Sequence, residues 1–262
     1  MNKLRVARMP YLNSDVFYRG FEGKFELRPL VPRAMAWAIE NREIDAGPLP
    51  VVEWFRMERD LAPVGDFCVA TGKAAISILL YCKVPAAELS GRRIAVTEHT
   101  STSVQLLRVL LAERWNAEGV ELVAPETPAD ALLLIGDLAL KNRHGVDGFP
   151  HMYDLGAVWH EHTGLPFVFA RWVARRDADA SQVAELEQAL GRSLADGLRN
   201  IDALAAASSV GLSPAEAAAY VRSFTYRMGP DQRSALAAFR ARLEQLPEWR
   251  PASPGARAGR RG

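Results

Sequence analysis

The chain has 262 residues, of which 49% are hydrophobic and 24% charged, a balance typical of a soluble globular protein with one large domain or two small lobes. Its 32 Lys and Arg residues are offset by 31 Asp and Glu residues, which argues against the strong net field of proteins that bind nucleic acid or anionic membranes. A small molecule is therefore the expected partner.

The N-terminus and the hydropathy of the chain predict a cytoplasmic location. Residues 1–6 form a short apolar and basic stretch without the apolar core of a secretory signal. No segment approaches the roughly 18 uninterrupted apolar residues that span a bilayer. We interpret the only cysteines, Cys68 and Cys82, as reduced, buried and packed like small apolar residues.

Short apolar runs alternate with stretches of helical periodicity, which predicts an α/β fold with largely parallel strands. The candidate strands are residues 4–7, 44–46, 77–81, 93–97, 131–135 and 167–173. The candidate helices are residues 33–41, 102–115 and an alanine-rich series from residue 180 onward, in which Ser213–Glu216 resembles a capped helix start. Residues 251–262 are rich in Arg, Pro and Gly and are predicted to be disordered.

The order of these elements predicts two lobes joined by two crossings of the chain, which would form a hinge. Residues 1–83 and 174–250 are expected to build the first lobe, and residues 84–173 the second. A cleft between the lobes is then the expected ligand site.

A cluster of hydroxyls lies between a predicted strand and the start of the predicted helix 102–115. It consists of Thr100, Ser101, Thr102 and Ser103. The unpaired amides at a helix N-terminus favour an anion. Any one of these hydroxyls could simply cap the helix, but four together predict a site for a carboxylate.

Two other turns carry candidate ligand-binding residues, and two weaker candidates lie elsewhere. Tyr11, Asn13 and Ser14 follow the first strand, where open α/β sheets bind ligands, although the segment can also be a plain turn. Gly136 allows a ligand to approach the backbone, and Asp137 can accept a substrate hydroxyl or cap a helix. Two weaker candidates are Pro48, in a rigid pocket wall after a strand, and Ser77, at the start of a crossing strand.

Other chemistries lack their sequence signatures. His160-Glu161-His162 places two histidines two residues apart, which turns them away from each other on a helix, and no zinc motif is present, so no metal site is predicted. The nucleophile elbow of serine hydrolases, the phosphate-binding loop of nucleotide triphosphatases and the glycine fingerprint of dinucleotide enzymes are also absent. The residues alone thus predict a two-lobed anion-binding protein.

Five strings in order along residues 4–240 resemble the MqnA branch of the MqnA/MqnD family. They are Pro-Tyr-Leu-Asn-Ser at 10–14, Asp-Ala-Gly-Pro at 45–48, Thr-Ser-Val at 102–104, Leu-Ile-Gly-Asp at 134–137 and Thr-Gly-Leu-Pro-Phe-Val-Phe-Ala at 163–170. The resemblance implies a type II periplasmic-binding-protein-like fold. It also implies a hydro-lyase without a cofactor that converts chorismate to 3-[(1-carboxyvinyl)oxy]benzoate, the first step of the futalosine route to menaquinone.

The resemblance also implies roles for individual residues. Asn13 and Ser77 fall at the reacting centre, and a substrate carboxylate helps to remove the proton. Thr100, Thr102 and Ser103 hold a carboxylate, and Gly136 and Asp137 line the cleft. One departure is Gly72-Lys73-Ala74, where relatives often carry an Asp-Gly-Pro-like turn; Lys73 either assists an anionic substrate or is solvated.

Three alternatives to this function stay open from the sequence. The first is a binding protein of the same fold that performs no chemistry, because a fold alone does not establish catalysis. The second is the naphthoate-synthase branch of the family, which would need a roomier cleft. The third, a sensing domain detached from a transcription regulator, is disfavoured because no helix-turn-helix segment or basic face is evident.

Overall fold

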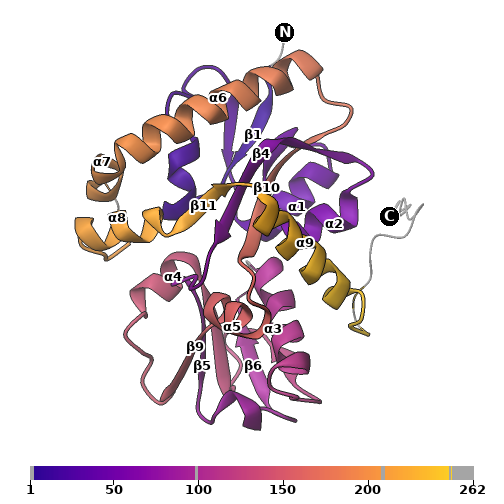
Figure 1. Cartoon of the computed structure of the whole chain (residues 1–262), viewed down its shortest axis with the longest axis vertical. Helices are drawn as coiled ribbons and strands as arrows, with labels where there is room; N and C mark the ends of the chain where they lie inside the picture. Colours follow the sequence, from indigo (N-terminus) through magenta and orange to yellow (C-terminus); the bar gives the residue numbers. More distant parts are fainter. Residues whose placement is uncertain (1–2, 98–99, 208–209, 248, 250–262) are drawn as a thin grey trace.

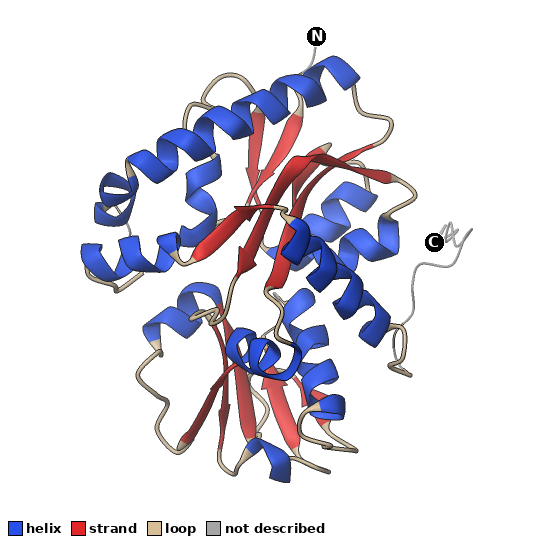
Figure 2. Cartoon of the chain, in the orientation of Figure 1, coloured by secondary structure: helices blue, strands red, loops and turns tan. Residues whose placement is uncertain are grey.

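The computed structural model describes residues 3–97, 100–207, 210–247 and 249, and the predicted disordered tail lies outside them. These residues form two sheets, one above the other, with helices packed on both (Figures 1 and 2). No described helix has the length and apolar character needed to cross a membrane.

The first sheet has six strands in the order β11-β4-β10-β3-β1-β2. They are β1 (Arg5–Arg8), β2 (Glu26–Pro29), β3 (Ala46–Pro50), β4 (Leu61–Thr71), β10 (Phe167–Arg175) and β11 (Phe224–Arg227). Strand β1 pairs in parallel with β2 and β3, whereas β10 runs antiparallel to both β3 and β4. The prediction of largely parallel strands is therefore wrong for the half of this sheet that contains β4 and β10.

The second sheet has five strands in the order β7-β6-β8-β5-β9. They are β5 (Ile78–Cys82), β6 (Arg93–Val96), β7 (Glu121–Val123), β8 (Ala131–Ile135) and β9 (His151–Asp154). Strand β6 is parallel to β7 and β8, while β5 is antiparallel to its two neighbours. The carboxyl ends of β6 and β8 consequently meet at the edge of this sheet that faces the first sheet (Figure 1).

Helices and short 3-10 turns connect the strands. They are α1 (Pro32–Glu40), α2 (Val51–Met57), α3 (Thr102–Glu113), α4 (Gly136–Lys141), α5 (Leu155–Thr163), α6 (Ala180–Arg199), α7 (Ile201–Ala206), α8 (Pro214–Arg222), α9 (Pro230–Leu243), η1 (Leu12–Phe17) and η2 (Ala86–Glu88). The predicted helices at 33–41 and 102–115 are confirmed. So is the capped start of α8, where Ser213 and Glu216 each accept a hydrogen bond from the other's backbone N–H.

The larger of two main cores packs around the first sheet, and the other is shared by both sheets and includes helix α9. The buried Phe239 of α9 packs against Trp159 of α5 and Phe167 of β10, with ring centroids 5.8 and 4.8 Å apart. Cys68 and Cys82 are free and buried, as predicted, and burial raises the pKa of each thiol to about 12.

The chain passes between the sheets twice, at residues 72–77 between β4 and β5 and at residues 164–166 between α5 and β10. We propose lobe boundaries at these crossings, in place of the boundaries at residues 84 and 173 expected from the sequence. Strand β5 belongs to the second sheet and β10 to the first, opposite to the sequence-based assignment. Both strands are largely apolar, and an apolar run does not show in the sequence which of two sheets the strand joins.

The first crossing is held by the carboxylate of Asp154, which begins helix α5. The carboxylate accepts hydrogen bonds from the backbone N–H groups of Ala75 and Ile76, at 2.9 and 2.6 Å. It also caps the helix by accepting from Gly156 and Ala157, at 2.9 and 3.0 Å. Ile76 has φ of 65°, a strained conformation for a β-branched residue, so these bonds stabilise an otherwise unfavourable turn.

Replacing Asp154 by Ala should lower the free energy of unfolding by about 2–4 kcal/mol, because four backbone N–H groups lose a charged acceptor. Urea unfolding followed by tryptophan fluorescence measures the loss. Asp179→Ala is the matched control, because Asp179 also caps a helix, where it accepts from the backbone N–H of Gln182, but lies outside both crossings between the sheets. Equal losses in the two variants would show that Asp154 is an ordinary helix cap.

Candidate functional site

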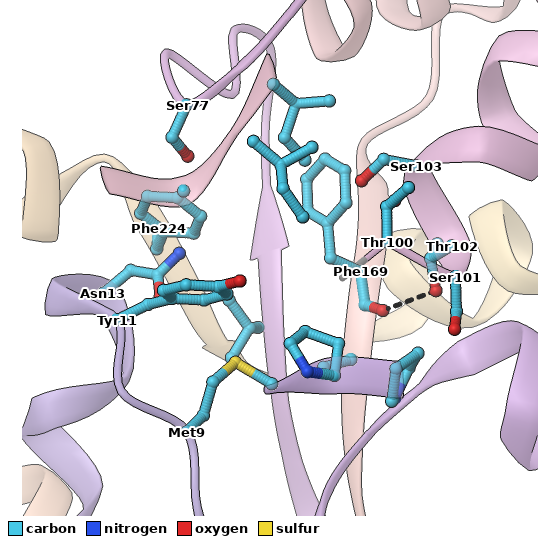
Figure 3. A pocket seen from close by; sticks show the side chains of 17 residues that line it. Met9, Tyr11, Asn13, Ser77, Thr100, Ser101, Thr102, Ser103, Phe169 and Phe224 are labelled. Atoms are coloured by element: carbon cyan, nitrogen blue, oxygen red, sulfur yellow. Dashed lines mark hydrogen bonds between the residues drawn. The ribbon is translucent and has the colours of Figure 1, made fainter. Parts of the chain in front are cut away.

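A pocket lies between the two sheets and encloses about 560 Å³ of empty space, counting its open mouth. Figure 3 shows the side chains around it. The lining residues are Met9, Tyr11, Asn13, Pro32, Pro50, Val69, Ser77, Ile78, Thr100, Ser101, Thr102, Ser103, Ile135, Gly136, Phe169, Ala170 and Phe224. The site sits at the carboxyl ends of β1, β6 and β8, where open α/β sheets bind ligands.

The described lining of the pocket is almost free of ionisable groups. Tyr11 is the only titratable side chain in it, and burial, assisted by the negative charge of Asp137, raises the pKa of Tyr11 to about 12. Tyr11 therefore stays protonated and neutral near pH 7. Hydroxyls, one amide and backbone N–H groups supply the polarity of the described lining.

The two predicted catalytic residues lie together on one side of the pocket (Figure 3). Asn13 is placed by the turn η1 after β1, and Ser77 by the clamped crossing before β5. Ser77 is buried, and its Oγ accepts a hydrogen bond of 2.7 Å from the hydroxyl of Tyr220. The side chain of Asn13 acts against the effect of burial by lowering the pKa of Tyr220, so the two side chains are neighbours.

Tyr220 has no counterpart among the residues predicted from sequence. It lies on α8, far along the chain from Asn13 and Ser77, and its hydroxyl is fully enclosed. In the sequence it is one of several apolar residues on a short helix, which is typical of a core position. Only the packing of α8 against η1 brings it to the site.

The predicted carboxylate site also lies at the pocket, on the side opposite Asn13 (Figure 3). All four hydroxyl residues of the cluster line the pocket and are buried. Ser101, at the N-cap position of α3, makes no side-chain capping bond, and Thr102 donates to the carbonyl of Phe169 at 3.1 Å. The buried Oγ1 of Thr100 has no hydrogen-bond partner among the described residues, so it is available to a ligand.

Gly136 lines the pocket at the start of α4, as predicted. Its φ is 59°, and a Cβ atom there would lie 2.9 Å from Cε1 of Tyr11, so glycine is required by both the backbone and the contact. Its N–H donates to the carbonyl of Ser77 at 2.8 Å, which ties two pocket segments together.

Three predicted site residues occupy other places than expected. Asp137 is not part of the lining; it lies in the first turn of α4 and does not cap that helix. Burial raises the pKa of the Asp137 carboxyl, and its Oδ1 has no hydrogen-bond partner among the described residues. Ser14 is buried behind Asn13 and donates to its Oδ1 at 3.2 Å. Pro48 sits within β3 opposite Trp172, and Pro50 takes the lining position instead.

Residues 47–50, expected as a pocket wall that follows a strand, are part of strand β3. Proline has no N–H and is normally excluded from the interior of a sheet. Here β1 pairs with β3 only at Ala46, so the two prolines that follow need to pair only with β10. The fold therefore extends the strand through prolines that end it in the sequence-based prediction.

The histidines of α5 have separate partners. His160 Nδ1 is 3.2 Å from the carbonyl oxygen of Leu165, and His162 Nε2 is 3.1 Å from a carboxylate oxygen of Glu113. Within the described part of the chain, no group of three His, Cys, Asp or Glu side chains is arranged to hold a metal ion. Lys73 is exposed at the first crossing and does not line the pocket.

Solved structures with similar folds support the assignment of the architecture. A protein from Archaeoglobus fulgidus matches with a TM-score of 0.73 at 18% identity, covering 92% of this chain and 97% of its own. The alkanesulfonate-binding protein SsuA from Xanthomonas axonopodis pv. citri, bound to MOPS, matches with a TM-score of 0.59 at 15% identity, covering 93% and 92%. The predicted periplasmic-binding-protein-like fold is thereby confirmed.

Sequence comparisons identify the family. A chorismate dehydratase from Thermus thermophilus is 29% identical over 238 residues, which cover 82% of this chain and 85% of that protein. The family model described as menaquinone biosynthesis matches residues 4–245, nearly the whole chain. The protein therefore belongs to the menaquinone biosynthesis family.

Proposed function

We propose that this protein is a chorismate dehydratase, a hydro-lyase that converts chorismate to 3-[(1-carboxyvinyl)oxy]benzoate and water in the cytoplasm. The observation that carries the proposal is the arrangement of the pocket. A cluster of hydroxyls at the N-terminus of α3 faces a pair of neutral polar residues, Asn13 and Ser77, across an otherwise apolar cavity. Chorismate has a carboxylate at one end of its ring and a departing hydroxyl at the other.

The proposed reaction requires little general acid or base catalysis by protein side chains. The ring hydroxyl leaves together with the proton on the carbon that bears the enolpyruvyl ether, and the ring becomes aromatic. Because aromatisation supplies much of the driving force, the protein mainly has to orient and desolvate the substrate. We propose that the enolpyruvyl carboxylate of the substrate itself accepts the proton.

In this arrangement each group of residues has one task. The hydroxyls of residues 100–103 and the amides that begin α3 hold the ring carboxylate. Asn13 and Ser77 donate hydrogen bonds to the departing hydroxyl, where negative charge develops. Tyr11, held against Gly136, and Phe169 enclose the ring. The reaction requires no cofactor.

Incubation of the purified protein with chorismate, without added metal or cofactor, tests the proposal. Liquid chromatography with mass detection should show the enolpyruvyl benzoate and loss of chorismate. Recovery of intact chorismate from a saturated complex would indicate a binding protein of the same fold. Turnover only of the larger, later intermediate in a competition assay would indicate the naphthoate-synthase branch.

Asn13→Ala and Ser77→Ala should each lower kcat by about 100- to 1,000-fold, because each removes one donor to the departing group. Both variants should stay folded by circular dichroism. Ser193→Ala is the matched control, since Ser193 is equally buried but donates to the carbonyl of Val16 in the core of the first sheet. Normal turnover by both site variants would remove these residues from the reacting centre.

Thr100→Val should raise the KM for chorismate about 10-fold or more, because a hydrogen bond to a carboxylate is lost. The same change should leave the free protein as stable or more stable, since the Thr100 hydroxyl is buried without a described partner. Thr97→Val is the control: the Thr97 hydroxyl is also buried and unpartnered among the described residues, but Thr97 does not line the pocket. An unchanged KM in Thr100→Val would place the carboxylate elsewhere.

A further inference from the structure

We infer that Tyr220 is a positioning residue for the proposed reaction: its hydroxyl donates to Ser77 Oγ and leaves the Ser77 proton for a ligand in the pocket. The inference rests on the proposed function for the identity of the reaction. The hydrogen bond that carries it joins two residues of the protein itself, so it can also be tested on its own.

The direction of this hydrogen bond follows from a count of protons. The Tyr220 hydroxyl has a single proton and donates it to Ser77 Oγ at 2.7 Å. The tyrosine oxygen can still accept a hydrogen bond, and the neighbouring side chain of Asn13, which lowers the pKa of Tyr220, carries amide N–H donors. In Figure 3 the amide nitrogen of Asn13 and the hydroxyl of Ser77 are turned toward the same space.

Another hydroxyl supports Asn13 from behind. The Oγ of Ser14, which is fully buried, lies 3.2 Å from Oδ1 of Asn13 and 3.4 Å from Sδ of Met9, and its single proton serves one of these acceptors at a time. The hydrogen bond that Ser77 receives comes from Tyr220. A buried hydroxyl that accepts a hydrogen bond is polarised, so Ser77 becomes a stronger donor.

The proton of the Ser77 hydroxyl is available for a hydrogen bond to a ligand. Its oxygen already accepts from Tyr220, and its own proton is directed at the carbonyl of Ala75 across 3.3 Å. That distance is long for a hydroxyl donor, whose usual value is about 2.7–2.8 Å. A ligand oxygen in the pocket can therefore replace Ala75 as the acceptor.

The same arrangement decides what Ser77 does in the reaction. Burial raises the pKa of Tyr220 well above its ordinary value, so this residue remains a donor throughout the physiological range. With Tyr220 donating to it, Ser77 serves as a hydrogen-bond donor to the departing ring hydroxyl. It does not act as the base that removes the ring proton.

Tyr220→Phe tests the inference because it removes one oxygen and keeps the ring, which packs against Phe224 with centroids 5.1 Å apart. We expect kcat to fall about 5- to 20-fold, the effect of losing one neutral hydrogen bond, with KM changed less than about twofold. In a Ser77→Ala background the same substitution should cause no further loss of kcat. Wild-type kcat in Tyr220→Phe, or losses that multiply in the double variant, would overturn the inference.

Tyr226→Phe is the matched control. Tyr226 is also buried, but its hydroxyl donates to the carbonyl of Val221 at 3.0 Å and has no recorded hydrogen bond to Asn13 or Ser77. Its loss should leave kcat unchanged. An equal fall of kcat in this control would show that any buried tyrosine hydroxyl near α8 has the same effect, and would overturn the specific role of Tyr220.

A measurement without substrate separates this inference from the proposed function. The thermal midpoints of Tyr220→Phe, Ser77→Ala and the double variant test the hydrogen bond in the absence of substrate. The decreases in midpoint caused by the two single substitutions should not add in the double variant. Additive decreases would overturn the inference, whichever substrate the protein converts.

If Tyr220→Phe does not fold, Tyr220→3-fluorotyrosine, a stronger donor of nearly the same size, should raise kcat at constant KM. An identical kcat in that variant would contradict the positioning role.

Discussion

The site depends first on the carboxylate of Asp154, because it fixes the backbone at the point where the chain leaves one sheet for the other. Ala75 and Ile76 donate to it from the crossing, and the first amides of α5 donate to it from the second sheet's helix. Without this acceptor the positive φ of Ile76 has no compensation. Ser77 is the next residue, so its place in the pocket follows from that single side chain.

The second constraint is electrostatic. Chorismate, the proposed substrate, is a dianion, and a pocket for it would be expected to contain Lys or Arg, yet the described lining contains neither. Hydroxyls and the start of α3 take the place of a formal positive charge, which suits the proposed reaction, in which one substrate carboxylate must remain basic. A lysine or arginine paired with that carboxylate would lower its basicity. The neutral lining is thus consistent with proton removal by the substrate.

The sequence predicts those parts of the fold and site that depend on local patterns. The hydroxyl cluster at residues 100–103, the start of α8 and the strands β6 and β8 lie where periodicity and capping place them. Strand β4 escaped prediction because Pro63 and Gly65 interrupt its apolar alternation, although the pairing with β10 and β11 tolerates both.

Other features could not be predicted because they arise from contacts between distant segments. Nothing near Tyr220 in the sequence distinguishes it from a residue of an ordinary core helix, and its role comes from α8 lying against η1. The same holds for Ser14, which resembles a ligand-binding hydroxyl in a turn but supports the amide of Asn13 instead.

These contacts also explain how one site can be built from segments of two sheets. Asn13 and Tyr220 are carried by elements of the first sheet, whereas Ser77 immediately precedes the first strand of the second. The Tyr220–Ser77 hydrogen bond therefore joins the two halves of the site directly. A movement of the second sheet away from the first would break this bond and leave a buried phenol without an acceptor, which is unfavourable. The bond that orients Ser77 thus also favours the arrangement of the sheets in which the reacting centre is complete.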